Sequence, residues 1–297
     1  MLTPPVVLAV AGTDSGGGAG LAADLATIGH LGAHAACVVT AVTAQSTTGV
    51  RAVHAVPATV VADQVDAVLD DLPVSAVKTG MLGSPEVVRL VAERLRHLPL
   101  VVDPVLVATS GAVLGDAAVV AAYRDHLLPA ALLATPNLAE ARALTGHGGT
   151  PAELAARLAD VGCWVVVTGG PEWQAGQRAG TATDWLCRPG GTPQPLVHAA
   201  VATTSDHGTG CTYSSALAAL LAETRGQNPV GDLAATPTDP TSEDLVSACL
   251  RAASYVASQL RTGSTWQLGR GRGPIAHTSP TPTSPTHTVQ TQQEEPV

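Results

Sequence analysis

The sequence predicts an α/β protein built around a mostly parallel sheet. Short apolar runs alternate along the chain with longer segments of helical periodicity, which is the pattern of βαβ units. The runs of strand length are Val6–Ala11, Ala35–Val42, Val74–Lys78, Leu98–Asp103, Leu132–Thr135 and Cys163–Thr168. The side chains that share a helical face are Leu21, Leu25 and Ile28 in one segment, and Val61, Val65, Val68 and Leu69 in another. Several runs end in glycine-rich or polar residues, and such a sheet binds ligands at the carboxyl ends of its strands.

Composition narrows the class of protein. Hydrophobic residues make up 45% of the 297 residues, and the core they form must be aliphatic because aromatic residues are only 2%. The formal net charge of −9 and the lack of a basic run argue against nucleic-acid or anionic-membrane partners. The five cysteines form no CxxC pair, which argues against a zinc site or a disulfide framework, and Cys37 and Cys163 are expected in the core.

The chain has no uninterrupted apolar run of membrane-spanning length and no signal-peptide pattern at its start, so we expect a soluble, cytoplasmic protein. Residues 225–243 are rich in Pro, Thr, Asp and Gly and predict a mobile surface insertion. Residues 278–297 consist mainly of Thr, Pro, Ser and Gln and predict a disordered tail. A single domain over residues 1–277 is therefore expected.

The segment His207–Thr212, with the sequence HGTGCT, precedes a strong helical sequence. Glycines at a helix entrance let backbone N–H groups converge, and the helix dipole adds positive charge there, so the segment suits an anion. It is not a Walker A loop, because the characteristic Lys is missing. An ordinary helix entrance would have the same local sequence, so this motif alone leaves both interpretations open.

The glycine-rich segment 11–20, AGTDSGGGAG, directly follows the first predicted strand. Its glycines allow close approach of the backbone to a ligand, although a flexible turn is the alternative. The spacing fits the dinucleotide fingerprint GxGxxG poorly, which disfavours a Rossmann site.

Polar residues follow other predicted strands. The amide of Gln45 can read the edge of a heterocycle, and Met81 can form an adaptable apolar wall, although Met is more often a core residue. Asp103 and Glu140 place carboxylates at two more strand ends, which suits Mg²⁺ beside a phosphate site. For Glu140, a solvated helix face is the alternative.

Six blocks occur in one order along the chain: AGTDSGGGAGLAADL, TAVTAQSTTGV, KTGMLGS, VDPVLVATSG, TPNLAEARALTG and HGTGCT. Together they resemble the hydroxymethylpyrimidine/phosphomethylpyrimidine kinase family of thiamine biosynthesis, in the ribokinase-like superfamily, from about Val6 to His277. The resemblance implies a three-layer αβα sandwich with helices on both faces of the sheet, and a homodimer. It implies transfer of phosphate from ATP, with Mg²⁺, to 4-amino-5-hydroxymethyl-2-methylpyrimidine and then to its monophosphate.

The resemblance also implies roles for single residues. The implied pyrimidine contacts are Gly12, Asp24, Gln45, Met81 and Val107. The implied ATP-binding residues are Asn137, Glu140 and Thr168, and the implied Mg²⁺ ligands are Asp103 and Glu140. The implied anion hole and catalytic position are Gly208, Thr209, Gly210 and Cys211.

Many ribokinase-like enzymes carry an Asp as the base where this chain has Cys211. A thiol at a helix N-terminus can have its pKa lowered toward neutrality. We therefore expect Cys211 to accept the proton of the hydroxymethyl group, with orientation of that hydroxyl as the alternative role.

Two positions depart from the family pattern. Thr168 replaces a Lys that reaches the nucleotide phosphates, and Asp206 stands where Thr is common. Both changes weaken ATP binding by Coulomb's law, unless Mg²⁺ or a basic residue such as Lys78 or Arg178 compensates. Two alternative functions follow: a pyridoxal/pyridoxine kinase, or a pyrimidine-binding sensor with little catalysis. Gln45 and Met81 favour the pyrimidine kinase.

Overall fold

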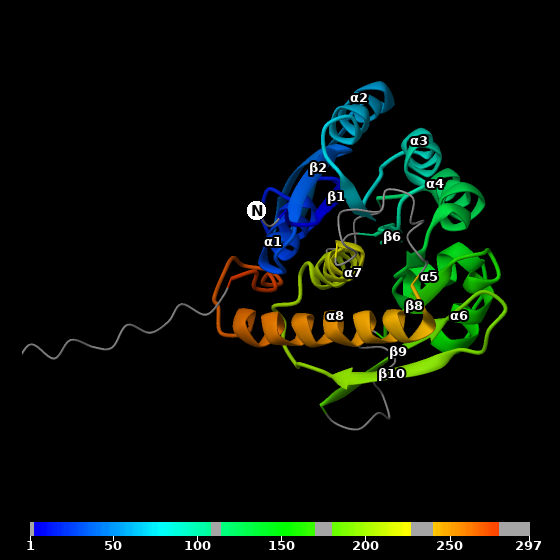
Figure 1. The fold of residues 1–297 in the computed structure, drawn as a ribbon. Coiled ribbons are helices and arrows are strands. Elements are labelled where there is room, and N and C mark those ends of the chain that lie inside the picture. The colour runs from blue at the N-terminus through cyan, green and yellow to red at the C-terminus, as the bar shows by residue number, and fades with distance from the viewer. Residues whose placement is uncertain (1–2, 108–113, 170–179, 227–239, 279–297) are drawn as a thin grey trace, which may run out of the picture.

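An eight-stranded sheet runs through the protein in the order β10-β9-β8-β7-β6-β5-β1-β2 (Figure 1). The computed structural model describes residues 3–107, 114–169, 180–226 and 240–278. Strands from β2 across to β8 are parallel to their neighbours, whereas β9 and β10 are antiparallel. The strands of this sheet are β1 (Val6–Ala11), β2 (His34–Val39), β5 (Val74–Thr79), β6 (Leu100–Val102), β7 (Leu133–Ala134), β8 (Trp164–Val167), β9 (Thr181–Cys187) and β10 (Gln194–Ala199).

Helices cover both faces of the sheet, which confirms the predicted αβα sandwich. Strand β1 shows the reason: alternate residues from Val6 join one core cluster, and alternate residues from Val7 join the other. Helices on the first face are α2 (Ala58–Leu69), α3 (Pro85–Leu95), α4 (Ala117–Ala122), α5 (Leu138–Thr145) and α6 (Pro151–Ala159), with short π and 3₁₀ turns at Tyr123–Leu127 and Leu128–Ala130. Helices on the second face are α1 (Gly20–His30), α7 (Thr209–Gly226) and α8 (Ser242–Gly263).

The predicted strand Ala35–Val42 divides in two. After β2 the chain turns at Thr40 and enters β3 (Ala41–Ser46), which pairs with β4 (Gly49–Ala55) in a separate antiparallel hairpin. The Thr40 backbone N–H donates to the Ala11 carbonyl at 3.0 Å, and its hydroxyl donates to the Met81 carbonyl at 2.6 Å. These bonds fix the hairpin beside the ends of β1 and β5.

Two other expectations need correction. Cys37 is exposed, because it lies on the edge strand β2, whereas Cys163 is buried as expected. Both ends of the expected insertion at 225–243 are helical, since α7 continues to Gly226 and α8 begins at Ser242. Its central residues 227–239 and the tail from residue 279 onward lie outside the described residues. Across the part of the chain that is described, no helix is long and apolar enough to cross a membrane.

Candidate active site

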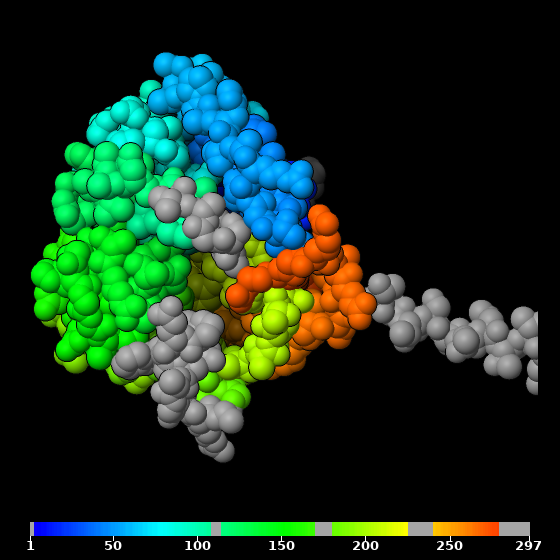
Figure 2. All heavy atoms as spheres, turned by 180° about the vertical axis from the view of Figure 1, so that it is seen from behind, coloured from blue at the N-terminus to red at the C-terminus, as the bar shows by residue number. Residues whose placement is uncertain are grey.

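A cavity of about 230 Å³ opens at the carboxyl ends of the parallel strands. Its walls come from the segments that follow β1, β5, β6, β7 and β8, from the β3–β4 hairpin and from the first turn of α7. Figure 2 shows the molecule hollowed between the green region of α4 to α6 and the orange segment that follows α8. This is the place where a sheet of this topology binds ligands.

The structure brings together all but one of the predicted site residues. Those that line the cavity are Gly12, Gln45, Met81, Asp103, Val107, Asn137, Glu140, Thr168, Gly208, Thr209, Gly210 and Cys211. Gly12 lets the Met81 methyl group pack directly on the backbone, because a Cβ atom at position 12 would displace that methyl group. The residues predicted for the ring, the metal and the phosphate thus share one space.

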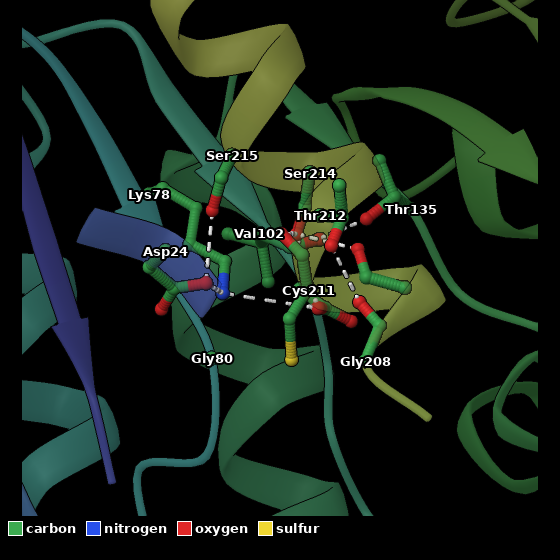
Figure 3. Close-up of polar contacts among 12 residues, drawn as sticks. Asp24, Lys78, Gly80, Val102, Thr135, Gly208, Cys211, Thr212, Ser214 and Ser215 are labelled. Atoms are coloured by element: carbon green, nitrogen blue, oxygen red, sulfur yellow. Dashed lines mark hydrogen bonds and ion pairs between the residues drawn. The ribbon is translucent and has the colours of Figure 1, made fainter. Parts of the chain in front are cut away.

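Asp24 is the exception, and the prediction that it contacts the ligand is wrong. It is fully buried and lies behind the cavity wall rather than on it. Its Oδ1 accepts hydrogen bonds from Lys78 Nζ at 2.6 Å and from the Ser215 hydroxyl at 2.8 Å (Figure 3). Helix α1 turns this carboxylate toward β5 and α7, so Asp24 supports the cavity from behind.

Lys78 brings a buried positive charge to the cavity floor. Its Nζ lies 3.9 Å from Asp103 Oδ2 in addition to its contact with Asp24. Burial alone would lower the pKa of Lys78, but the nearby Asp24, Cys211 and Asp103, together with the hydrogen bond to Asp24, outweigh burial and the pKa is raised. Because Asp24 already neutralises this ammonium, Lys78 is a poor substitute for the cation missing at Thr168. Arg178 lies outside the described residues.

The entrance of α7 has the geometry of an anion site. Gly208 has a φ of +90°, which side chains rarely adopt, and a Cβ atom there would overlap the Gly18 carbonyl. The Thr212 backbone N–H and its hydroxyl each donate to the Gly208 carbonyl at 2.9 Å. The first turn of any helix has N–H groups without partners inside the helix, and here that turn lines the cavity.

Cys211 lies near Lys78 at this entrance (Figure 3), and the charges of Lys78 and Asp103 both act on its thiol. Burial raises the pKa of the Cys211 thiol to about 12; Lys78 lowers it, but Asp103 and Asp24 add to the rise. The expected lowering of this pKa by the helix N-terminus is therefore wrong for the site without ligands. The thiol is protonated at neutral pH, which favours orientation of a hydroxyl over acceptance of its proton.

Asp103 and Glu140 form a pair of buried carboxylates that suits a divalent cation. Burial and repulsion from Asp103 raise the pKa of Glu140, and burial raises the pKa of Asp103 despite the nearby Lys78. A cation between two such groups would relieve both effects. Among the described residues no three His, Cys, Asp or Glu side chains gather as a metal site. Waters and phosphate oxygens would therefore have to complete the coordination of Mg²⁺.

Asn137 and Glu140 also have a structural task at the start of α5. The Asn137 Oδ1 accepts from the Glu140 backbone N–H at 2.9 Å, and Glu140 Oε2 accepts from the Asn137 backbone N–H at 3.0 Å. This capping box holds the Glu140 carboxylate in one orientation beside the cavity. Glu140 is buried, so the solvated-face interpretation does not apply.

Sequence reasoning missed Asp14 and His207 as site residues, although both line the cavity and bond to each other at 2.8 Å. Their place inside the two glycine-rich motifs was the available signal. It also missed the partner of Asp206, which forms an ion pair with Arg272. The negative charge at this departure from the family pattern is thus balanced within the chain.

Comparison with known proteins agrees with this geometry. The family model for phosphomethylpyrimidine kinase matches residues 14–229. A hydroxymethylpyrimidine/phosphomethylpyrimidine kinase of Rhizobium meliloti is 41% identical over 92% of this chain and 96% of its own length. A bifunctional thiamine-biosynthesis protein of Geobacter sulfurreducens is also 41% identical, and the chain spans 52% of that longer protein.

The fold is also found in a solved structure. A pyridoxal kinase from Staphylococcus aureus in complex with AMP-PCP and pyridoxal has a TM-score of 0.75 and 28% identity, and the match covers 93% of this chain and 94% of that one. The family match extends over most of the sequence, and the cavity holds the motifs in the expected arrangement. The chain belongs to the phosphomethylpyrimidine kinase family.

Proposed function

We propose that this kinase transfers the terminal phosphate of ATP to the hydroxymethyl oxygen of 4-amino-5-hydroxymethyl-2-methylpyrimidine, and then phosphorylates the monophosphate. One observation carries the proposal. The anion site at Gly208–Cys211 and the cleft of Gly12, Gln45 and Met81 open into the same cavity. A phosphate held at the first and a ring held at the second would therefore meet.

The acceptor ring would lie in the cleft between the glycine loop and the hairpin. Met81, packed on Gly12, offers an apolar wall, and Val107 offers a second apolar surface. The Gln45 amide can donate to a ring nitrogen and accept from an amino group, which suits an aminopyrimidine.

Positioning and charge neutralisation account for the chemistry that this site would perform. Phosphoryl transfer passes through a loose transition state, so the nucleophile needs little activation. The N–H groups of the α7 entrance would stabilise the charge on the transferred phosphate. The protonated Cys211 thiol would hydrogen-bond the acceptor hydroxyl and aim it at phosphorus. The proton of that hydroxyl would pass to an oxygen of the transferred phosphate as the new O–P bond forms and ADP leaves.

Asp103 and Glu140 are the residues that would hold Mg²⁺. When bound, Mg²⁺ would neutralise part of the charge of the triphosphate. This contribution matters in a chain whose Thr168 supplies no cation.

Phosphorylation of pyridoxal is a second candidate, supported by the likeness to the Staphylococcus aureus pyridoxal kinase. The sequence relatives of this chain favour the pyrimidine. A pyrimidine sensor with little catalysis has Thr168 in its favour, but the paired charges of Asp206 and Arg272 remove its other support. A homodimer, which rests on the resemblance to the family alone, and a cytoplasmic location complete the proposal.

A coupled ADP-release assay tests this function with hydroxymethylpyrimidine, its monophosphate and pyridoxine as separate acceptors. We expect Mg²⁺-dependent ADP release with both pyrimidines and much less with pyridoxine. Release with pyridoxine alone would reverse the choice of substrate. If no acceptor yields ADP although hydroxymethylpyrimidine raises the melting temperature, the protein is a sensor.

A further inference from the structure

We infer that Asp14 and His207 are positioning residues that hold the ring-binding loop and the phosphate-binding loop in register. The inference rests on the proposed function, since it concerns how the two halves of that cavity are aligned. His207 Nε2 lies 2.8 Å from Asp14 Oδ2, and both side chains are buried in the cavity wall. The two residues are 193 positions apart in the sequence.

Asp14 organises the glycine loop around its own carboxylate. Oδ1 accepts from the Gly16 backbone N–H at 2.8 Å, and Oδ2 accepts from the Ala19 N–H at 2.9 Å and from the Gly18 N–H at 3.2 Å. Burial would raise the pKa of Asp14, but the hydrogen bonds from His207 and Gly16 outweigh it, so the pKa is lowered. The ionised carboxylate can only accept, which makes His207 Nε2 the donor.

The backbone of His207, just before α7, is held by the segment that follows α8. Its N–H donates to the Gly273 carbonyl at 3.0 Å, and its carbonyl accepts from the Ile275 N–H at 3.0 Å. The next residue is Gly208, the first of the anion site. Loss of the side-chain bond to Asp14 would therefore let the glycine loop shift relative to the phosphate-binding N–H groups.

The two loops pack too closely for a side chain at their contact. A Cβ atom on Gly18 would lie 2.6 Å from the His207 ring, and one on Gly208 would overlap the Gly18 carbonyl. This close packing restricts how the glycine loop and the α7 entrance can lie relative to each other. The hydrogen bond between Asp14 and His207 holds them in the observed arrangement.

The same bond leaves Gln45 available to a ligand. Gln45 Nε2 lies 3.3 Å from His207 Nε2, but with the His207 Nε2 hydrogen directed at Asp14 both nitrogens are donors, so they form no hydrogen bond with each other. Ser15 holds the backbone of Gln45 in place, because its hydroxyl donates to the Gln45 carbonyl at 2.7 Å and accepts from the Gln45 N–H at 2.8 Å. Hairpin, glycine loop and helix entrance are thus tied together around the acceptor position.

Kinetics of side-chain variants test this inference. His207→Leu removes the donor, His207→Gln keeps an N–H near the same place, and Asp14→Asn removes the charge. His198→Leu is the matched control, because His198 makes an equivalent 3.1 Å bond to the buried Asp184 but does not line the cavity.

We expect His207→Leu and Asp14→Asn to lower kcat about 10- to 100-fold, the loss that misplacement of reacting groups produces. Separate binding of hydroxymethylpyrimidine and of AMP-PCP should change by less than about threefold. His207→Gln should recover most of kcat, and the double variant Asp14→Asn/His207→Leu should be no slower than either single one. A normal kcat in His207→Leu, additive losses, or an equal loss in His198→Leu would overturn the inference.

A calorimetric titration separates this inference from the proposed function, because it needs no turnover. In the wild-type protein AMP-PCP should tighten binding of hydroxymethylpyrimidine, and His207→Leu should abolish that tightening. A wild-type protein that binds both ligands but releases no ADP would defeat the proposed function, while this titration would still decide the role of the pair. Equal coupling in both proteins, or none in the wild type, would overturn it.

Discussion

Cys211 is the residue at which local and tertiary effects oppose each other. A helix N-terminus favours a thiolate, but burial beside Asp103 raises the pKa of the thiol to about 12. The protonated thiol can still hold the acceptor hydroxyl. Cys211 then contributes to the reaction by orienting the acceptor hydroxyl and not by acting as a base.

Cys211→Ala should keep hydroxymethylpyrimidine binding and lose most of kcat, whereas Cys211→Ser should retain more activity because it keeps a hydrogen-bonding group. At a Mg²⁺ concentration that keeps Asp103 and Glu140 ionised, the rate should also be flat between about pH 7 and 9, since a thiol with this pKa stays protonated throughout that range. The measurements are calorimetric binding and a pH–rate profile. A rate that climbs tenfold per pH unit, together with an inactive Cys211→Ser, would restore the thiolate as the base.

At the scale of elements, the segment after α8 balances the charge of the loop before α7. Arg272 Nε donates to Asp206 Oδ1 at 2.7 Å, and a second bond joins Arg272 Nη2 to Asp206 Oδ2. Asp206 lines the cavity, so its charge would otherwise oppose a bound triphosphate. Two segments distant in the sequence thus compensate for one departure from the family pattern.

Arg272→Gln should raise the KM for ATP about three- to tenfold, because it leaves the Asp206 carboxylate unpaired beside the phosphates. Asp206→Asn/Arg272→Gln should restore the wild-type KM, and added salt should reduce the effect. Arg251→Gln is the matched control, since Arg251 pairs with Glu223 at 3.0 Å on the surface. The explanation fails if the double variant has the KM of the single Arg272→Gln variant.

At the scale of the whole molecule, the segment that follows α8 completes the domain. Ile275 and Ala276 are buried, and backbone bonds join this segment to His207. Figure 1 shows it in orange beside α1, next to the entrance of α7. The segment up to Ala276 is therefore packed against the rest of the described chain.

A chain that ends at Thr278 should keep the stability and kcat of the full chain. A chain that ends at Leu268 should lose about 2 to 5 kcal/mol of unfolding free energy, because it removes the buried Ile275 and Ala276 and the bonds to His207. Urea unfolding of both truncations measures the difference. Equal stability of the two would show that this segment is not part of the folded domain.

Local sequence was sufficient to predict the structure wherever one short segment of the chain decides it. Strand β1 matches its predicted range of Val6–Ala11, since six consecutive apolar residues are stable only when both faces are buried. The placement of Gly208–Cys211 at a helix entrance beside the cavity was predictable, because glycines before a helix act through their own backbone. Met81 follows β5 as the sequence predicted, whereas Gln45, expected at a strand exit, lies inside β3.

Tertiary structure decided whatever depends on partners distant in the sequence. The sequence placed Asp24 on a helix, but only folding brings Lys78 to it and turns it away from the cavity. Folding also brings His207 to Asp14, and it buries Cys211 beside charged residues that are distant in the sequence, which raises the pKa of the thiol. Backbone preferences act over a few residues and can be read along the chain, whereas burial and charge act across space and depend on which strands and helices meet.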